Sequence, residues 1–343
     1  MKTKDRGTVM LIIALLLLPL LLTALPGCAA DERKHSRTLF AMDTHVDITL
    51  YHHSAQIAQT TIGEISAEIE RLENILNRHM PGSDLQRINA AAGKEPVQVS
   101  RETVFVLERA LEFAALSGGA FDPTIAPLLE LWGFGGGGVP VVPAPEALAR
   151  VRQLVDYRAV VLDKAKGTVF LPQAGMKLDL GGIAKGYIVD RAQELARQSA
   201  SASFVNAGGD ISISGRKPTG DDWRIAVRDP HDPRRWLAII NMEGGSVTTS
   251  GDYERYFEAE GVRYHHILDP HTGMPAFGLS SVTIVAGDTL TADALATAVF
   301  VLGKEKGMAL VERLPAVEAI LVNSDGNMLV SSGLAGQVEI LGE

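Results

Sequence analysis

Hydrophobic residues recur with a helical period through the first half of the chain. Between Ala55 and Leu76 they stand mostly three or four positions apart, at Ile57, Ile62, Ile65, Ile69, Leu72 and Leu76, which predicts an amphipathic helix. Pro81-Gly82 follows as a break. A second helix is predicted over 101–116, stopped by Gly118-Gly119, a short one within 121–138 before a glycine-rich loop, and another over 145–155.

Short alternating segments dominate from residue 158 onward. Segments 159–163 and 168–171 predict a hairpin, 176–180 a strand and 187–197 a helix, and seven more strand-like segments run from SFVNAGG to SVTIVAG. The end of the chain predicts a helix from Thr291, a second near 304–313 and two strands. An earlier strand is expected within 39–51, where Val46, Ile48 and Leu50 alternate. This order predicts an α+β fold with a mixed or antiparallel sheet core flanked by helices.

The N-terminus predicts export and attachment to a membrane. Lys2, Lys4 and Arg6 precede an apolar run over 9–25, which is short for a spanning helix and has the order of a secretory signal. The run ends in Leu-Pro-Gly-Cys28, which resembles a lipoprotein box. We therefore expect a signal peptide over 1–27, lipid on Cys28 that anchors the chain to a membrane, a tether over 28–37 and one domain over 38–343. A plain signal peptide with a free cysteine, and an uncleaved anchor, are the alternatives.

Composition removes several classes of function. The net charge of -9 gives no general basic surface for nucleic acid. Cys28 is the only cysteine among the 343 residues, so the predicted domain needs no disulfide and has no cysteine nucleophile or metal ligand.

A carboxylate interrupts the apolar helix predicted from Thr291. Asp293 and Thr297 stand four residues apart, on one helix face. A carboxylate in an apolar site needs a partner, and Mg²⁺ takes carboxylate, hydroxyl and phosphate oxygens. The alternative is structural: Asp293 in the first helical turn after an N-cap at Thr291, with the Thr297 hydroxyl bonded to the backbone carbonyl at 293.

Two glycine pairs lie between predicted elements. In KLDLGGIAKGY (177–187) a strand would end near Asp179, and a helix would follow Gly181-Gly182, with Lys185 nearby. Backbone N–H groups at such a helix start bind anions. VNAGGDIS (205–212) has a second pair, where glycine permits a tight turn or close approach of a ligand.

Three histidines lie in YHHILDPHTG (264–273). Adjacent residues of a strand point to opposite faces, so at most one of His265 and His266 faces a given site. A structural role and a role as a base both remain open.

Seven motifs together carry a family resemblance that covers the chain from about residue 38. They are AMDT, GGAFDPTIAPLLELWGFG, LDLGGIAKGY, NAGGDI, TSGDYERYF, HHILDPHTG and TADALATAVFVLG, in this order. The chain resembles the ApbE family of FAD:protein FMN transferases, which are periplasmic and often lipid-anchored. The resemblance implies Mg²⁺-dependent transfer of FMN from FAD to a threonine or serine hydroxyl, with release of AMP. It also implies that the acceptors are flavoprotein subunits of membrane redox complexes.

The resemblance also assigns site residues. It implies that Mg²⁺ is held by Asp293 and Thr297, the backbone at Gly182, and Ala296. For FAD it implies Met42, His79, Ala120, Phe121, Asp122, Asp179, Lys185 and Ile267; His79 stands where the family commonly has a tyrosine. His266 matches the histidine that helps to deprotonate the acceptor hydroxyl, and Asp252 of SGDY is an alternative base. The remaining alternatives are an Mg²⁺-dependent FAD pyrophosphatase that yields FMN and AMP, and a non-catalytic FAD-binding lipoprotein.

Overall fold

The computed structural model describes residues 32–135 and 138–341. The predicted signal segment 1–27 and Cys28 lie outside the described residues. No helix in the described ranges is long and apolar enough to cross a membrane.

An eight-stranded sheet forms the centre of the molecule, and its neighbouring strands are all antiparallel. This confirms the α+β prediction. In spatial order the strands are β1 (Arg33–Ala41), β2 (Thr44–His52), β6 (Ala202–Ala207), β7 (Asp210–Ser214), β10 (Gly245–Gly251), β13 (Leu279–Ala286), β14 (Glu318–Asn323) and β15 (Met328–Val330).

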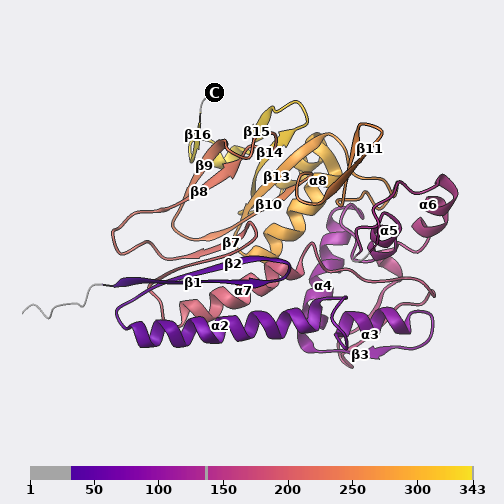
Figure 1. Ribbon diagram of the computed structural model, residues 1–343, viewed down its shortest axis with the longest axis horizontal. Coiled ribbons are helices and arrows are strands. Elements are labelled where there is room, and N and C mark those ends of the chain that lie inside the picture. The colour runs from indigo at the N-terminus through magenta and orange to yellow at the C-terminus, as the bar shows by residue number, and fades with distance from the viewer. Residues whose placement is uncertain (1–31, 136–137, 342–343) are drawn as a thin grey trace, which may run out of the picture.

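Helices cover one face of this sheet and bury the main core. α2 lies along β1 and β2, α7 packs against α2 under β6 and β7, and α8 packs against α7 under β10 and β13 (Figure 1). Strand positions of one parity, such as Val46, Ile48 and Leu50, point into this core. The helices are α2 (Ala55–Leu76), α3 (Asp84–Ala91), α4 (Arg101–Leu116), α5 (Ala126–Leu131), α6 (Pro145–Arg152), α7 (Ala184–Arg197) and α8 (Thr289–Val311).

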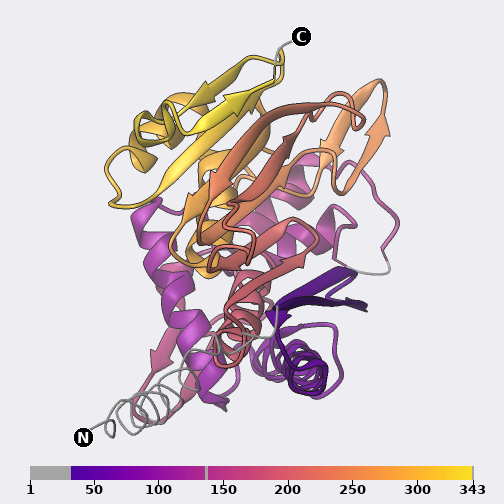
Figure 2. The same cartoon turned by 90° about the vertical axis from the view of Figure 1, so that its left-hand side faces the viewer.

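The opposite face of the sheet carries a smaller core. Phe204 and Ile213 from the large sheet pack there against Trp223 and its neighbours in a three-stranded sheet. That sheet has the order β16 (Val338–Ile340), β9 (Trp236–Met242) and β8 (Trp223–Arg228). Figure 2 shows the β8–β9 pair and the C-terminal strands at the end of the molecule away from α2.

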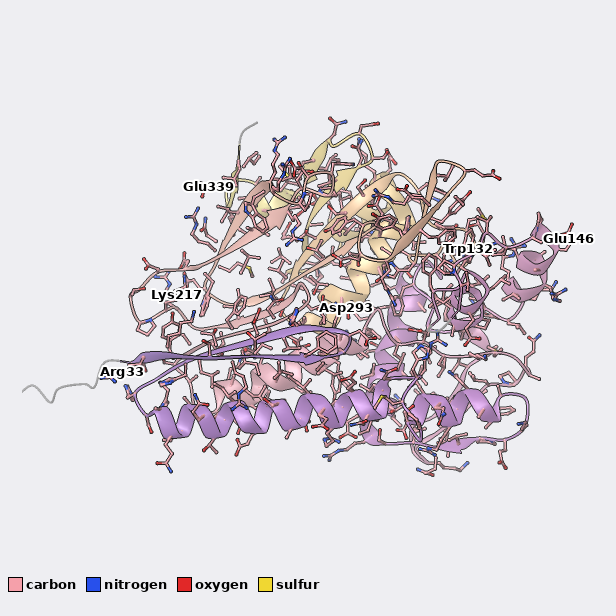
Figure 3. The ribbon with its side chains drawn as sticks, in the orientation of Figure 1. Arg33, Trp132, Glu146, Lys217, Asp293 and Glu339 are labelled. Carbon is pink, nitrogen blue, oxygen red and sulfur yellow. The ribbon has the colours of Figure 1, made fainter. Side chains whose placement is uncertain are left out.

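A third core surrounds Trp132, at the side of the molecule where α5 and α6 lie (Figure 3). Phe257 and Tyr264 stack on each other beside the Trp132 ring. They come from a hairpin of β11 (Tyr256–Ala259) and β12 (Val262–His265).

The remaining elements are small. A three-stranded sheet of β3 (Val97–Gln98), β5 (Thr168–Phe170) and β4 (Val161–Asp163) lies near α3. Two short 3-10 helices cover Tyr157–Ala159 and Ser332–Leu334.

One predicted boundary and one predicted strand are wrong. Residues 33–37 of the predicted tether belong to β1, which pairs with β2 from Arg33 onward. β1 is an edge strand with mostly exposed side chains, so its polar sequence looks like a linker.

The strand predicted over 176–180 is also absent, apart from one isolated bridge at Lys177. The N–H of Leu178 donates to the side chain of Asn89 at 2.7 Å, and its carbonyl accepts from the same amide at 3.0 Å. A side chain therefore takes the place of a neighbouring strand.

Candidate functional site

Asp293 is a buried carboxylate, 5% exposed, near the start of α8. The N-cap of this helix is Asp288, which accepts a hydrogen bond from Thr291 N at 2.8 Å. The helix therefore begins two residues earlier than predicted, and Asp293 lies beyond the first turn, where the helix dipole gives little stabilisation. The structural interpretation based on an N-cap at Thr291 is wrong.

Close crossing of α7 and α8 brings Asp293 against Gly186. The N–H of Gly186 donates to Asp293 Oδ2 at 3.0 Å. A Cβ at Gly186 would lie 2.4 Å from the carbonyl oxygen of Thr289 and 2.9 Å from Asp293 Cβ. Only glycine permits this approach, which fixes one carboxylate oxygen to the start of α7.

The glycine turn before α7 lies against Thr297. A Cβ at Gly182 would be 3.1 Å from Thr297 Oγ1 and 3.3 Å from the Phe121 ring. Within the described ranges Thr297 Oγ1 makes no hydrogen bond, so the alternative bond to the carbonyl at 293 is absent. The fold thus brings together three residues predicted for one site: Gly182, Asp293 and Thr297.

Lys185 lies among two buried carboxylates. Its Nζ is 3.0 Å from Oδ2 of Asp210, the first residue of β7, which is 1% exposed. Burial, followed by repulsion from Asp210, raises the pKa of Asp293 well above its usual range, and Lys185 opposes that rise. Burial by itself lowers the pKa of Lys185, but the negative charges of Asp210 and Asp293 outweigh burial, so the pKa is raised overall. Asp210 was not singled out from the sequence; its position after Gly208-Gly209 was the available signal.

This cluster fits a divalent cation. Asp293 Oδ2 is used by Gly186, but its other oxygen and the Thr297 hydroxyl make no hydrogen bond within the described part of the chain. Two carboxylates face a single ammonium group, and an uncompensated buried charge demands a partner. No group of three or more His, Cys, Asp or Glu side chains in the described ranges is arranged to hold a metal. A cation here would therefore depend on hydroxyl, backbone and phosphate oxygens as well, which suits Mg²⁺.

Asp179 precedes the glycine turn and is held from two sides. Gly181 N donates to its Oδ1 at 2.7 Å, and Arg78 Nε donates to its Oδ2 at 2.6 Å. Arg78 also binds Glu130 Oε1 at 2.8 Å, and its side chain is 6% exposed. Arg78 thus joins the end of α2 to the glycine turn. Sequence reasoning missed it because its partners lie 52 and 101 residues away.

His79 follows Arg78 and is exposed, with its pKa lowered by partial burial and by Arg78. The carboxylates of Asp179 and Asp43 oppose this shift, so His79 lies within their electrostatic range. Met42 and Asp43 both have positive φ, 53° and 58°, and form the turn between β1 and β2. Two residues predicted to contact FAD, Met42 and His79, therefore lie toward the same end of the site.

Ala120, Phe121 and Asp122 are buried after the turn that ends α4. Phe121 reaches the site through its contact with Gly182. The Asp122 carboxylate is used within the protein: Oδ1 accepts from the Thr124 N–H and hydroxyl, and Oδ2 accepts from Tyr157 N at 3.1 Å. Three internal hydrogen bonds thus hold the Asp122 carboxylate in place, and its contact with FAD stays a prediction.

The two adjacent histidines have different roles in the structure. His265 is buried; its Nε2–H donates to the carbonyl of Ala276 at 2.7 Å, and its Nδ1 accepts from Ile267 N at 3.3 Å. Both nitrogens of His265 are therefore used, which makes it a structural histidine. Ile267 is buried, and its carbonyl accepts from Ala276 N.

His266 has one nitrogen available. Its Nδ1 lies 3.2 Å from the carbonyl of Arg255; because a carbonyl only accepts, Nδ1 carries the proton and Nε2 carries the lone pair. Burial, then Arg255, lowers the pKa of His266 to about 3. Lys185 contributes to this decrease, so the histidine and the lysine lie within electrostatic range.

Asp252 follows β10 and lies in a different polar group. Its Oδ1 is 3.6 Å from Arg263 Nη1. Burial raises its pKa, while His265 and Arg263 oppose the rise. Asp252 thus faces the structural histidine and an arginine, and its role as an alternative base stays a prediction.

Four of the predicted residues therefore lie close together, and the other predicted residues lie around them. Gly182, Lys185, Asp293 and Thr297 meet where α7 begins, and Asp293 lies in the middle of the molecule (Figure 3). Ala296 is fully buried in α8, and its contact with a cation stays a prediction.

A family model described as the ApbE family matches residues 42–321. The chain belongs to the ApbE family. It is 39% identical to the FAD:protein FMN transferase of Treponema pallidum over 92% of this chain and 91% of that protein. An FAD:protein FMN transferase of Klebsiella pneumoniae is 36% identical over 88% of this chain and 93% of that protein.

Solved ApbE structures share the fold. The ApbE protein of Thermotoga maritima superposes with a TM-score of 0.82 at 38% identity, covering 89% of this chain and 99% of that one. The flavinyl transferase ApbE of Pseudomonas stutzeri gives a TM-score of 0.81 at 31% identity, covering 90% and 97%. The family model, which matches residues 42–321, thus covers every residue predicted for the FAD and metal sites, from Met42 to Thr297.

Proposed function

We propose that this ApbE-family chain is an FAD:protein FMN transferase, which moves FMN from FAD to a threonine or serine hydroxyl of a flavoprotein and releases AMP. The observation that carries the proposal is the buried group of Lys185, Asp210 and Asp293 at the start of α7. Such a group suits the pyrophosphate of FAD together with a divalent cation. The relatives from Treponema pallidum and Klebsiella pneumoniae, both FAD:protein FMN transferases, support the same reaction.

Asp293, Thr297 and the backbone at Gly182 would hold Mg²⁺, with Ala296 adjacent. Bound there, Mg²⁺ would supply positive charge that neutralises phosphate oxygens. The ammonium group of Lys185 would bind the phosphates from the other side. These interactions position the FMN phosphorus, and positioning with charge neutralisation is the main contribution of an enzyme to phosphoryl transfer.

The acceptor hydroxyl oxygen forms a bond to the FMN phosphorus, and the bond from that phosphorus to the AMP oxygen breaks. AMP leaves with the electron pair, and the hydroxyl proton passes to Nε2 of His266. Because His266 is neutral through the neutral pH range, this lone pair is available. The negative pyrophosphate would raise the pKa of His266 toward the range in which a general base works well.

We further propose that the chain is attached through Cys28 to the periplasmic side of a bacterial membrane. Its acceptors would then be flavoprotein subunits of membrane redox complexes. The N-terminal sequence and Cys28 support this proposal.

Treatment of expressing cells with globomycin, which inhibits the signal peptidase that cleaves lipoproteins, tests this attachment. Accumulation of the uncleaved precursor is expected, and unchanged processing would contradict the proposal.

Flavin transfer is tested by incubating the chain with FAD, Mg²⁺ and a candidate acceptor domain, followed by in-gel flavin fluorescence. The acceptor band is expected to fluoresce, and an acceptor with its threonine changed to alanine is expected to stay dark. If both acceptors stay dark while FAD is hydrolysed, the chain is a pyrophosphatase; if FAD stays unchanged, it is a binding protein.

His266→Asn is expected to slow transfer by about 10²- to 10⁴-fold, the usual contribution of a positioned base. Asparagine can still donate to the carbonyl of Arg255, so FAD affinity should change little. Rates at saturating FAD and affinity from flavin fluorescence separate the two effects.

His265→Asn is the matched control for this variant. It loses the buried hydrogen bond from Nε2 to the carbonyl of Ala276, so it should lower the melting temperature more than His266→Asn does. A fully active His266→Asn enzyme would exclude His266 as the base.

A further inference from the structure

Lys185 lies within electrostatic range of two buried carboxylates, Asp210 and Asp293. It forms its ion pair with Asp210, at 3.0 Å. It also directly precedes Gly186, whose N–H binds Asp293, and its charge influences the pKa of Asp293. The position of the ammonium group therefore decides which carboxylate is neutralised.

Asp210 is well placed to hold the lysine. It lies on β7 inside the large sheet, directly after the turn formed by Gly208 and Gly209, and it is 1% exposed. Its Oδ1 has no hydrogen-bond donor in the described part of the chain, and Lys185 is its ion-pair partner there. A buried carboxylate with one cationic partner holds that partner strongly.

We propose that Asp210 is a positioning residue that keeps the ammonium group of Lys185 away from Asp293, so that Asp293 stays available to a divalent cation. The inference rests on the proposed function, because it places that cation at Asp293. In this proposal Asp210 acts through Lys185, its ion-pair partner, and not as a ligand of the cation.

Removal of the Asp210 charge leaves Asp293 as the nearby buried carboxylate. Lys185 would then shift its ion pair to Asp293 and compete with the divalent cation for the same oxygen. Cation binding should fall although no cation ligand has been changed. Removal of Lys185 as well should relieve the competition, which a purely structural role of Asp210 would not predict.

Mn²⁺ tests this directly, because its binding to the full-length chain in detergent can be followed by electron paramagnetic resonance without FAD. Asp210→Asn is expected to weaken Mn²⁺ binding by about 10-fold or more, because ion pairs in a protein interior are strong. The double variant Asp210→Asn with Lys185→Met should return to within about 3-fold of Lys185→Met alone. Circular dichroism checks that each variant folds, and Asp210→Ser repeats the test if the asparagine variant does not fold.

Asp190→Asn is the matched control. Asp190 is another carboxylate whose charge raises the pKa of Asp293, but it binds Thr289 N and Leu290 N and not Lys185. This variant should bind Mn²⁺ within about 3-fold of the wild type, because Lys185 keeps its partner.

Two results would overturn the inference: wild-type Mn²⁺ affinity in Asp210→Asn, or a double variant as weak as Asp210→Asn alone. The second result would mean that Asp210 acts by its own charge. A wild-type chain that binds no Mn²⁺ would instead contradict the metal site of the proposed function.

Discussion

Asp293→Asn is expected to reduce FMN transfer by at least about 100-fold at saturating FAD, which is the usual loss when one group that stabilises developing charge is removed. The asparagine oxygen can still accept from Gly186 N, so the contact between α7 and α8 is kept while the negative charge is lost. Asp293→Ala should abolish turnover as well, and it also leaves the Gly186 N–H without its acceptor.

Stability separates this loss from unfolding. The pKa of Asp293 is raised by burial and by Asp210, so its ionised form is a cost to the folded state. Asp293→Asn should therefore keep or raise the melting temperature measured at neutral pH. Full activity of either variant at ordinary Mg²⁺ concentrations would refute the metal assignment.

Gly186→Ala is expected to lower both the free energy of unfolding and the rate of transfer. The added Cβ would lie 2.4 Å from the carbonyl oxygen of Thr289, so α7 must move away from α8. Overpacking of this kind costs about 1–3 kcal/mol. The same movement breaks the hydrogen bond from Gly186 to Asp293, so transfer should fall with stability.

Gly63→Ala is the matched control, because Gly63 is also inside a helix but has nothing within 4 Å of the added Cβ. Alanine should there raise the free energy of unfolding by about 0.5–1 kcal/mol. Urea unfolding followed by circular dichroism measures both variants. Equal effects at the two positions would show that the crossing of α7 and α8 is not tight.

The long helices could be predicted from the sequence because their own periodicity determines them. Helices were predicted over 55–76 and 101–116, and α2 and α4 have these bounds. β1 was missed because an edge strand can be polar on both faces. Segment 176–180 has the composition of a strand, but the side chain of Asn89 satisfies its backbone.

The centre of the site could be predicted in part. Asp293 and Thr297 stood out because they are polar residues in an apolar helix, and the glycine pair marked the start of α7. Asp210 and Arg78 could not be singled out, because their importance comes from partners distant in the sequence. The strand pattern alone left open which of the two adjacent histidines faces the site, and the family resemblance indicated His266. The hydrogen bonds agree in that they leave Nε2 of His266 available and occupy both nitrogens of His265.

The ratio of AMP released to flavin bound on the acceptor tests the central claim most directly. AMP can be measured by chromatography and bound flavin by the mass of the intact acceptor, each in the presence of Mg²⁺ and again with excess EDTA. Transfer at the Asp293 site predicts equal amounts of the two products with Mg²⁺ and neither product with EDTA. AMP that forms at the same rate without any flavin on the acceptor would contradict it.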